Sequence, residues 1–321
     1  MSDRTICVLG GTGFVGGHLV TRLANAGWRV RLLTRSAARH RALKVLPTVT
    51  IVQGDVYNPE FLRRQVAECT AVINLVGILN ESAGHRDGKG FERAHVELTG
   101  KLIAACQESG VRRVLQMSSL KANAADGPSH YLRTKGEAEA IVNRARDIDG
   151  TIFQPSVVFG ADDSFINVFA ALLRVPSPLF LLPRANARLQ PVYIGDVVTA
   201  FAQAIDNPAT FGKTYQLGGP EVYSLRELIE LIASSLGVRR KVIGMPDALA
   251  RLQAFIMDFV PGKPFSTDNY LSLTVNSICD SNGLERLGIQ PTSSARLIPQ
   301  LLGGRLGRGR LDNYRRRNQS A

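Results

Sequence analysis

The segment RTICVLGGTGFVG, residues 4–16, decides the fold. Residues 4–9 form an apolar run rich in β-forming side chains that is too short for a helix, which predicts a buried strand. The glycine-rich residues 10–16 follow directly, and aliphatic side chains then recur every four residues until Gly27, which predicts a helix that ends there. A second β-forming run at 29–34 completes a strand, glycine turn, helix and strand, the βαβ unit.

The same alternation continues to about residue 155. Further strands are expected at 49–52, 71–76, 113–117 and 151–153. Helices are expected at 59–67, 91–109 and 131–145. Strands that alternate with helices predict an α/β fold with a doubly wound parallel sheet of the Rossmann type and right-handed crossovers.

Beyond residue 155 strands and helices no longer alternate regularly. Extended segments are expected at 190–193 and 215–217, and helices at 165–174, 197–205, after Ser224, at 248–259 and at 295–302. We therefore expect three parts: a dinucleotide-binding domain at 1–160, a smaller C-terminal α/β substrate lobe at 161–302, of which about 190–220 returns to the first domain, and a basic tail at 303–321.

The composition, 45% hydrophobic and 21% charged, excludes disordered and fibrous classes. Four scattered cysteines without a CxxC pair argue against a disulfide framework or a zinc site and favour a reducing, cytoplasmic setting. Residues 1–5 are polar and leave no room for an export signal. The most apolar stretch, 165–182, is interrupted by Arg174, Pro176 and Pro178, so no membrane span is expected.

The formal net charge is +12, and six arginines lie in the last 17 residues. Such a tail can bind anionic lipid, nucleic acid or an acidic partner subunit, and a solvated end without partners is the alternative. Nucleic acid is not expected, because only the charge supports it and no DNA- or RNA-binding motif occurs. Peripheral contact with the inner face of a membrane, or with a respiratory complex, remains the alternative to a purely cytoplasmic location.

Gly10, Gly13 and Gly16 give the spacing GxxGxxG between a strand and a helix. The backbone of such a turn approaches a pyrophosphate closely, which a Cβ would hinder. The N-terminus of the following helix offers free amides and the positive end of its dipole to the phosphates. The turn therefore predicts a dinucleotide site, whose other expected residues are Thr12, Phe14 and Val15.

Arg35 ends the second strand, 19 residues after Gly16, where NAD-binding proteins usually carry an acidic residue. A guanidinium pairs well with a 2′-phosphate, so NADP(H) is favoured over NAD(H). Arg39 and Arg41 are alternative partners of that phosphate, and simple surface arginines are the remaining alternative.

Two later strand ends point to the same cofactor. Asp55 and Val56 follow the third strand, where the carboxylate can accept a hydrogen bond from adenine and the valine can pack on its ring. Asn74, Val76 and Gly77 end the fourth strand, and Gly77 permits a close approach. Open α/β sheets bind ligands at the carboxyl ends of their strands, so all five are cofactor-binding candidates.

Ser118 and Ser119 end the fifth strand, and Tyr131 and Lys135 begin the next helix four residues apart, on one face. A lysine ammonium beside a phenol is expected to lower the tyrosine pKa, so that Tyr131 can give or take a proton at a carbonyl or hydroxyl oxygen. A serine would orient that oxygen. Ser119 is preferred for this role, although the sequence does not separate it from Ser118.

Together these residues resemble the short-chain dehydrogenase/reductase superfamily in its extended or atypical, NAD-dependent epimerase/dehydratase-like branch. The segments FERAHVE at 91–97, QPVYIGDV at 190–197 and LGIQPT at 287–292 look most like the NAD(P)H-binding accessory subunit of mitochondrial respiratory complex I and its bacterial relatives. The stretch from Met245 to Ser266 also fits, so the resemblance covers about 6–302.

The resemblance implies that Lys135 also holds the nicotinamide ribose and that Pro155 and Val158, in the matching segment 155–160, contact the cofactor. Two positions depart from the family pattern. Gln154 replaces a common arginine, which bears on the substrate pocket, and His95 replaces a common asparagine, which puts a proton relay in doubt.

The first functional hypothesis is an NADP(H)-dependent oxidoreductase, with a transient-cofactor epimerase or dehydratase as a variant. The second is a non-catalytic NADPH-binding accessory or assembly module of a respiratory or membrane-associated complex. The resemblance to the bacterial relatives also implies a link to ubiquinone metabolism. Histidine spacing suggests no metal site, and neither a GxSxG elbow nor a P-loop motif occurs. The small-molecule substrate and the oligomeric state stay open.

Overall fold

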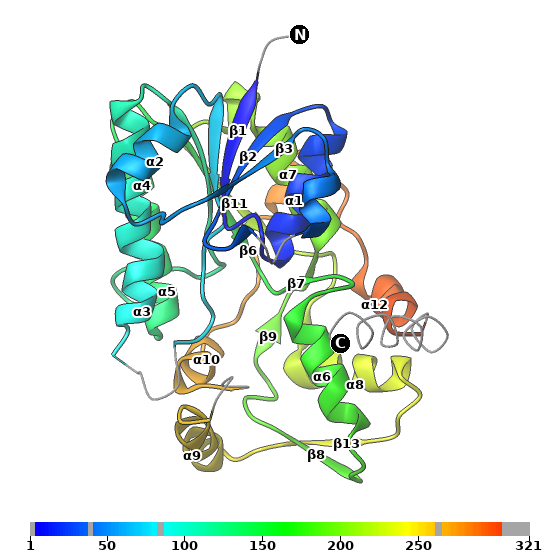
Figure 1. Cartoon of the computed structure of the whole chain (residues 1–321). Helices are drawn as coiled ribbons and strands as arrows, with labels where there is room; N and C mark the ends of the chain where they lie inside the picture. Colours follow the sequence, from blue (N-terminus) through cyan, green and yellow to red (C-terminus); the bar gives the residue numbers. More distant parts are fainter. Residues whose placement is uncertain (1–3, 38–40, 82–86, 261–264, 304–321) are drawn as a thin grey trace, which may run out of the picture.

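The computed structural model describes residues 4–37, 41–81, 87–260 and 265–303. Within them, seven parallel strands form the main sheet in the order β11-β6-β5-β4-β1-β2-β3 (Figure 1). These strands are β1 (Thr5–Leu9), β2 (Arg29–Thr34), β3 (Val49–Gln53), β4 (Ala71–Asn74), β5 (Arg113–Met117), β6 (Asp149–Pro155) and β11 (Lys213–Leu217). The predicted fold class is confirmed.

Helices cover both faces of the sheet (Figure 1). Those on one face are α1 (Phe14–Asn25) and α7 (Ile194–Ala204), and those on the other are α2 (Pro59–Val66), α4 (Leu98–Glu108) and α5 (His130–Arg144). Successive residues of β1 point to opposite faces, so Ile6 and Val8 join one apolar core while Cys7 and Leu9 join the other. A strand buried on both faces explains the unbroken apolar run in the sequence.

The prediction of one regular helix at 91–109 is wrong in its first half. The structure has α3 (Lys89–Phe91), a π-helical turn η3 (Glu92–Glu97) and then α4. A π turn holds one extra residue per turn and is frequent at functional sites, but side-chain periodicity does not reveal it. In η3 the side chain of His95 is buried, with 1% of it exposed.

Two expected extended segments also differ. β4 ends at Asn74, because the Asn74 side chain accepts a hydrogen bond from the Val76 amide at 3.1 Å. Of the segment expected at 190–193, only Val192 and Tyr193 form a strand, and another short strand precedes the segment at Arg188–Leu189; the two strands pair with different partners. These pairs are β9 (Arg188–Leu189) with β12 (Tyr223–Ser224), and β10 (Val192–Tyr193) with β7 (Val158–Phe159).

The C-terminal lobe has its own apolar core. Its helices are α6 (Ser164–Arg174), α8 (Leu225–Ser235), α9 (Asp247–Met257), α10 (Thr267–Ser272) and α12 (Ser294–Gly303), and its other strands are β8 (Leu179–Leu182) and β13 (Lys241–Gly244). The short α11 (Gly283–Arg286) packs instead on β11 of the main sheet. Short 3-10 turns lie at η2 (Arg41–Val45) and η4 (Pro208–Thr210). The predicted cap of α8 is confirmed, since Ser224 and Glu227 form a capping box.

Two buried polar side chains, Asp196 and Gln190, connect distant segments of the chain by hydrogen bonds. The Asp196 carboxylate accepts hydrogen bonds from the amide and the hydroxyl of Thr292, at 2.7 and 2.9 Å. Gln190 donates to the Gly219 carbonyl at 2.7 Å and accepts from the Cys279 amide at 2.8 Å. Segments that stand far apart in the sequence are therefore held together by buried side chains.

Arg39, the side chain of Arg41 and the tail beyond Gly303 lie outside the described residues, so the expectations for them stay predictions. Across the part of the chain that the structure describes, no helix combines the length and the apolar character needed to cross a bilayer.

The buried Arg113 of β5 connects the sheet to the end of α7 and to η4, and it gives the first test. Arg113 donates to the carbonyls of Ala204, Ile205 and Asp149 and to the Thr210 hydroxyl. Arg113→Met leaves these acceptors unpaired, so we expect the free energy of unfolding to fall by about 3 kcal/mol in urea titrations.

The matched control is the neighbouring Arg112→Met. Its guanidinium contacts Asp149 at 3.2 Å with 60% of the side chain exposed, so the expected change is about 0.5 kcal/mol or less. Equal losses in the two variants would contradict this account of Arg113.

Candidate active site

The turn between β1 and α1 is packed so closely that a side chain does not fit at Gly10 or at Gly16. Gly10 has φ +74°, and a Cβ there would lie 2.8 Å from the Val76 nitrogen. A Cβ on Gly16 would lie 2.4 Å from the Gly10 carbonyl oxygen. The first turn of α1 therefore lies directly against the end of β1, next to the end of β4.

The N-terminus of α1 can receive an anion. Gly13 is the N-cap and brings no side chain to the first amides, and the turn that follows contains no acidic residue. The free amides and the positive end of the helix dipole suit a phosphate group. Phe14 lies beside Gly160, since a Cβ on that glycine would be 3.2 Å from the Phe14 ring.

Arg35 and Asp55 lie at the ends of the neighbouring strands β2 and β3, and both are exposed. The charges of both residues influence the pKa of Tyr57, which is raised mainly by burial. The positive charges of Arg93 and Arg35 oppose this shift, and the negative charge of Asp55 adds to it. The guanidinium of Arg93 stacks over the Tyr57 ring at 4.3 Å. Neither Tyr57 nor Arg93 was a candidate in the sequence, because no motif marks them. Val56 is half-buried in the same turn.

Asn74 is not open to a cofactor, which corrects the expectation for it. Its side chain is fully buried, donates to Gln116 at 3.0 Å and accepts from the Val76 amide. Asn74 therefore shapes the end of β4 rather than lining the site. Gly77 does face the site, because a Cβ there would lie 3.0 Å from the Lys135 Nζ.

Lys135 is an almost fully buried cation, with 3% of the residue exposed. Its Nζ donates to the Met117 carbonyl at 3.2 Å. Burial lowers the pKa of Lys135 to about 8, and the Glu139 carboxylate one turn further along α5 opposes that shift. The ammonium therefore stays charged at neutral pH but needs the polar groups around it.

The expectation that the pKa of Tyr131 is lowered is wrong for this structure. Burial raises the pKa of Tyr131, and a hydrogen bond with Ser119 only partly opposes it. The Lys135 ammonium donates to a backbone carbonyl instead of the phenol, which explains the difference. Tyr131 therefore keeps its proton at neutral pH.

The structure separates the two serines. Ser119 is half-buried and close enough to Tyr131 to lower the pKa of its phenol, whereas Ser118 is buried and lowers the pKa of the Glu139 carboxyl. Gln154 donates to Glu139 at 2.8 Å, so it supports the buried carboxylate beside Lys135 rather than facing a substrate pocket. The pKa of Glu139 is raised by burial, which its polar neighbours oppose.

Pro155 is the last residue of β6, and Val158 begins the short strand β7 that follows it. The Pro155 carbonyl accepts a hydrogen bond from the Leu120 amide at 3.0 Å and so fixes the loop after Ser119. Val158 in β7 is half-buried against the core beneath α1. Among the described side chains, no contact between these two residues and Tyr131 is seen, so their expected contact with the cofactor stays a prediction.

His95 forms a neutral wall of the site. Its Nε2 accepts from the Ile78 amide at 3.2 Å, and its Nδ1 is bonded to the Thr134 hydroxyl at 2.9 Å. Burial and the nearby Lys135 charge lower the pKa of His95 to about 2. Its ring meets the Tyr131 ring edge-on, with centroids 5.6 Å apart. A group that stays neutral at physiological pH positions Tyr131 but does not carry protons by changing its charge.

Asp268 in α10 is a residue that sequence reasoning missed. Its carboxylate accepts hydrogen bonds from the amides of His130 and Tyr131, at 2.7 and 3.2 Å. It thereby fixes the N-terminus of α5, where a negative charge is favourable. It is 137 residues from Tyr131 in the sequence, so local pattern offered no signal for the pairing.

These residues place a glycine turn, a buried lysine and a protonated tyrosine at one edge of a parallel sheet. A family model described as the NAD dependent epimerase/dehydratase family matches residues 6–218. The chain belongs to this family. It is therefore an NAD(P)-binding member of the extended short-chain dehydrogenase/reductase group, and the resemblance seen in the sequence is confirmed.

Relatives within this family differ in role. The mitochondrial NADH dehydrogenase (ubiquinone) 1 alpha subcomplex subunit 9 of Arabidopsis thaliana is 30% identical over 300 residues, which cover 89% of this chain and 73% of the relative. The same subunit of Rattus norvegicus is 30% identical over 309 residues, with coverages of 91% and 78%. A ceramide reductase of Caulobacter vibrioides is 28% identical over 250 residues, with coverages of 75% and 74%.

Solved structures of the epimerase/dehydratase kind share the fold. A dTDP-glucose 4,6-dehydratase of Streptomyces venezuelae superposes with a TM-score of 0.70 at 20% identity, covering 95% of this chain and 98% of that one. A nucleoside-diphosphate-sugar epimerase of Staphylococcus aureus gives 0.72 at 17% identity, covering 92% and 99%. At these identities the similarity speaks for the fold alone.

The tight turn generates a test with a matched control. Gly16→Ala introduces a Cβ 2.4 Å from backbone atoms of the turn, and overpacking of this kind costs about 1–3 kcal/mol. We expect the Kd for NADPH, measured by calorimetry, to rise about tenfold or more. Gly17→Ala has no described atom within 4 Å of its Cβ and should leave the Kd unchanged. Equal affinities in the two variants would show that the turn does not hold the cofactor.

Proposed function

We propose that the chain is an NADP(H)-dependent oxidoreductase that reduces a carbonyl group, with Tyr131 as the proton donor. The observation that carries the proposal is that Ser119 acts on Tyr131 while Lys135, one turn further along α5, lies beside Gly77, at the strand edge that also holds the glycine turn.

NADPH, when bound, supplies the hydride. The residues of the chain do the rest: Ser119 orients the substrate oxygen, and Tyr131 gives it a proton. The Lys135 ammonium stabilises the phenolate that remains after the proton has left. Since the pKa of Tyr131 is raised, the phenol is protonated at neutral pH, which favours reduction of a carbonyl over oxidation of an alcohol.

The preference for NADP(H) rests on Arg35. It is exposed at the end of β2, next to the strand end that carries Asp55, and so is free to reach an adenosine 2′-phosphate. Asp55 and Val56 would then lie at the adenine, and Gly10, Gly13 and Gly16 at the pyrophosphate.

The substrate class is proposed from relatives. One relative is named for reduction of ceramide, a lipid, and several others are subunits of a ubiquinone-linked complex. An apolar carbonyl compound, such as a quinone or a lipid ketone, is therefore the proposed substrate class, with the C-terminal lobe closing over it.

A second candidate is a non-catalytic NADPH-binding accessory or assembly module of a respiratory or membrane-associated complex. The 30% identity to the mitochondrial subunits, which extends over 89% of the chain, favours it. The two candidates share the cofactor site and differ in whether Tyr131 is used.

Removal of one hydroxyl tests the first candidate. For Tyr131→Phe, we expect turnover of NADPH with short-chain ubiquinone or with aldehydes and ketones to fall about 100-fold or more, because the proton donor is lost. The Kd for NADPH should stay within about twofold, since only the hydroxyl changes. NADPH oxidation is followed by absorbance, and Tyr223→Phe in the lobe serves as the control. Unchanged turnover would refute the mechanism. A wild-type protein that holds NADPH but never oxidises it would favour the second candidate.

Cofactor choice is tested separately. Arg35→Ala removes a charge-assisted contact to the 2′-phosphate, so we expect the Kd for NADPH to rise about tenfold or more while that for NADH stays within about twofold. Arg29→Ala, at the other end of β2, is the control. Identification of the nucleotide released from the denatured wild-type protein adds an independent check. Stoichiometric NADH there would contradict the role of Arg35.

A further inference from the structure

The helix α9 turns its small residues toward α10. Ala250 and Ala254 are fully buried and contact Tyr270 of α10. The large residues of the same segment are exposed instead: Leu249, Leu252, Phe255, Ile256, Phe259 and Val260, each with between 37% and 55% of its surface open. We call these six residues the apolar face of α9; Phe259 and Val260 lie just beyond its last residue, Met257.

The spacing of the apolar face follows a helix. Leu249, Leu252, Ile256 and Phe259 recur at intervals of three or four residues and so form one stripe, turned away from the two buried alanines. A helix at a purely aqueous surface normally buries such a stripe. Each of these partly exposed apolar side chains forgoes part of the free energy that complete burial would give, so the arrangement calls for a covering surface.

The neighbourhood of the apolar face is basic. The segments 174–184 and 239–251 carry six basic residues and a single acidic one, Asp247, which pairs with both Arg184 and Arg251. The positive excess therefore comes from the other four, Arg174, Arg239, Arg240 and Lys241. A second exposed apolar group, Val175, Leu179 and Leu181, lies in the first of these segments. Figure 1 shows α9 at the lower left and the pair β8 and β13 at the lower right, all at the end of the molecule opposite the N-terminus.

We propose that this end of the lobe docks on an anionic lipid surface, with the apolar face of α9 in the boundary between headgroups and acyl chains. Apolar side chains flanked by cations suit that boundary, because the stripe enters the lipid while the basic residues meet the phosphates. The excess of positive charge around the stripe is what favours lipid over an uncharged protein surface.

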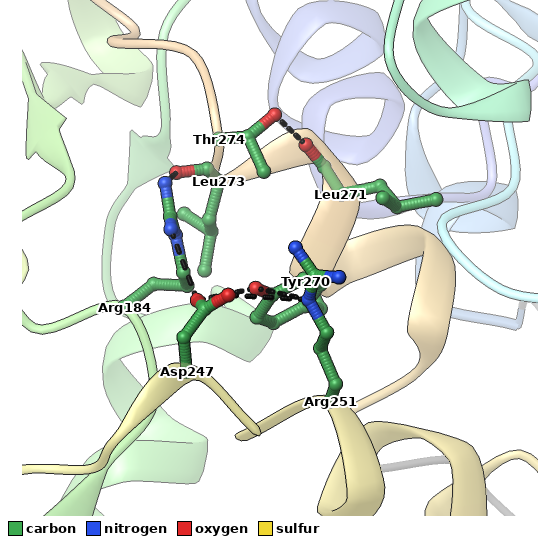
Figure 2. A network of polar contacts seen from close by, with 7 residues as sticks. All are labelled: Arg184, Asp247, Arg251, Tyr270, Leu271, Leu273 and Thr274. Atoms are coloured by element: carbon green, nitrogen blue, oxygen red, sulfur yellow. Dashed lines mark hydrogen bonds and ion pairs between the residues drawn. The ribbon is translucent and has the colours of Figure 1, made fainter. Parts of the chain in front are cut away.

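The docking helix is connected to the candidate active site. Figure 2 shows Asp247 of α9 between Arg184 and Tyr270; Asp247 is 3.2 Å from the Arg184 guanidinium and accepts from the Tyr270 hydroxyl, to which Arg251 donates at 3.1 Å. α10, which carries Tyr270, also carries the carboxylate of Asp268 that holds the Tyr131 amide. The docking helix α9 is therefore hydrogen-bonded to the same helix, α10, that fixes the N-terminus of α5 at Tyr131.

Vesicle flotation with the full chain tests the proposal. We expect binding to vesicles of phosphatidylcholine with about 30% phosphatidylglycerol, weaker binding to phosphatidylcholine alone, and release by salt. Leu252→Glu with Ile256→Glu should lower the bound fraction at least about tenfold, because two carboxylates then face the lipid. The control Val45→Glu changes an equally apolar residue, 79% exposed in η2, and should bind like the wild type.

Thermal unfolding and NADPH affinity verify that each variant folds, and Phe259→Glu alone repeats the test if the double variant does not. Failure of the wild type to float would overturn the proposal. So would equal flotation of the double variant, which would assign lipid binding to the tail. A wild-type dimer that the double variant dissociates, without vesicle binding, would make the apolar face a contact between copies of this chain. None of these results depends on whether Tyr131 is catalytic.

Discussion

Close backbone approach at the β1–α1 turn is the constraint on which the rest of the site depends. The contacts of Gly10 with the end of β4 and of Gly16 with Gly10 leave no room for side chains. They bring the N-terminus of α1 to the same edge as Gly77, where Lys135 comes within reach. A phosphate-binding helix end and an acid–base site thus become neighbours, although 125 residues separate Gly10 from Lys135.

Much of this architecture could be predicted from local pattern. The strands of the main sheet are short apolar runs because both of their faces are buried, and the helices between them show clear periodicity or caps. The glycine turn and the Tyr131 and Lys135 pair could be found because their chemistry requires fixed spacing along the chain. The mitochondrial-subunit resemblance followed from segments such as 190–197, whose Asp196 binds Thr292 of another matching segment.

Other features could not be found in this way, for specific physical reasons. The π turn at His95 adds one residue to a turn whose side chains still look helical. Asn74 looked like a cofactor contact because it ends a strand, but three-dimensional packing turns it into the core. Asp268 meets Tyr131 only through the fold, and the pKa of Tyr131 depends on burial, which spacing does not report.

The buried Lys135 also links the active site to the stability of the whole protein. Its pKa is about 8 in the folded chain, against 10.5 for an ordinary lysine, so between these values the unfolded chain binds more protons than the folded one. The contribution of this group to the free energy of unfolding therefore increases as the pH rises through that window. Below pH 8 the folded protein carries the full electrostatic penalty of a desolvated ammonium, and part of its conformational stability is given up to keep a charge beside the tyrosine.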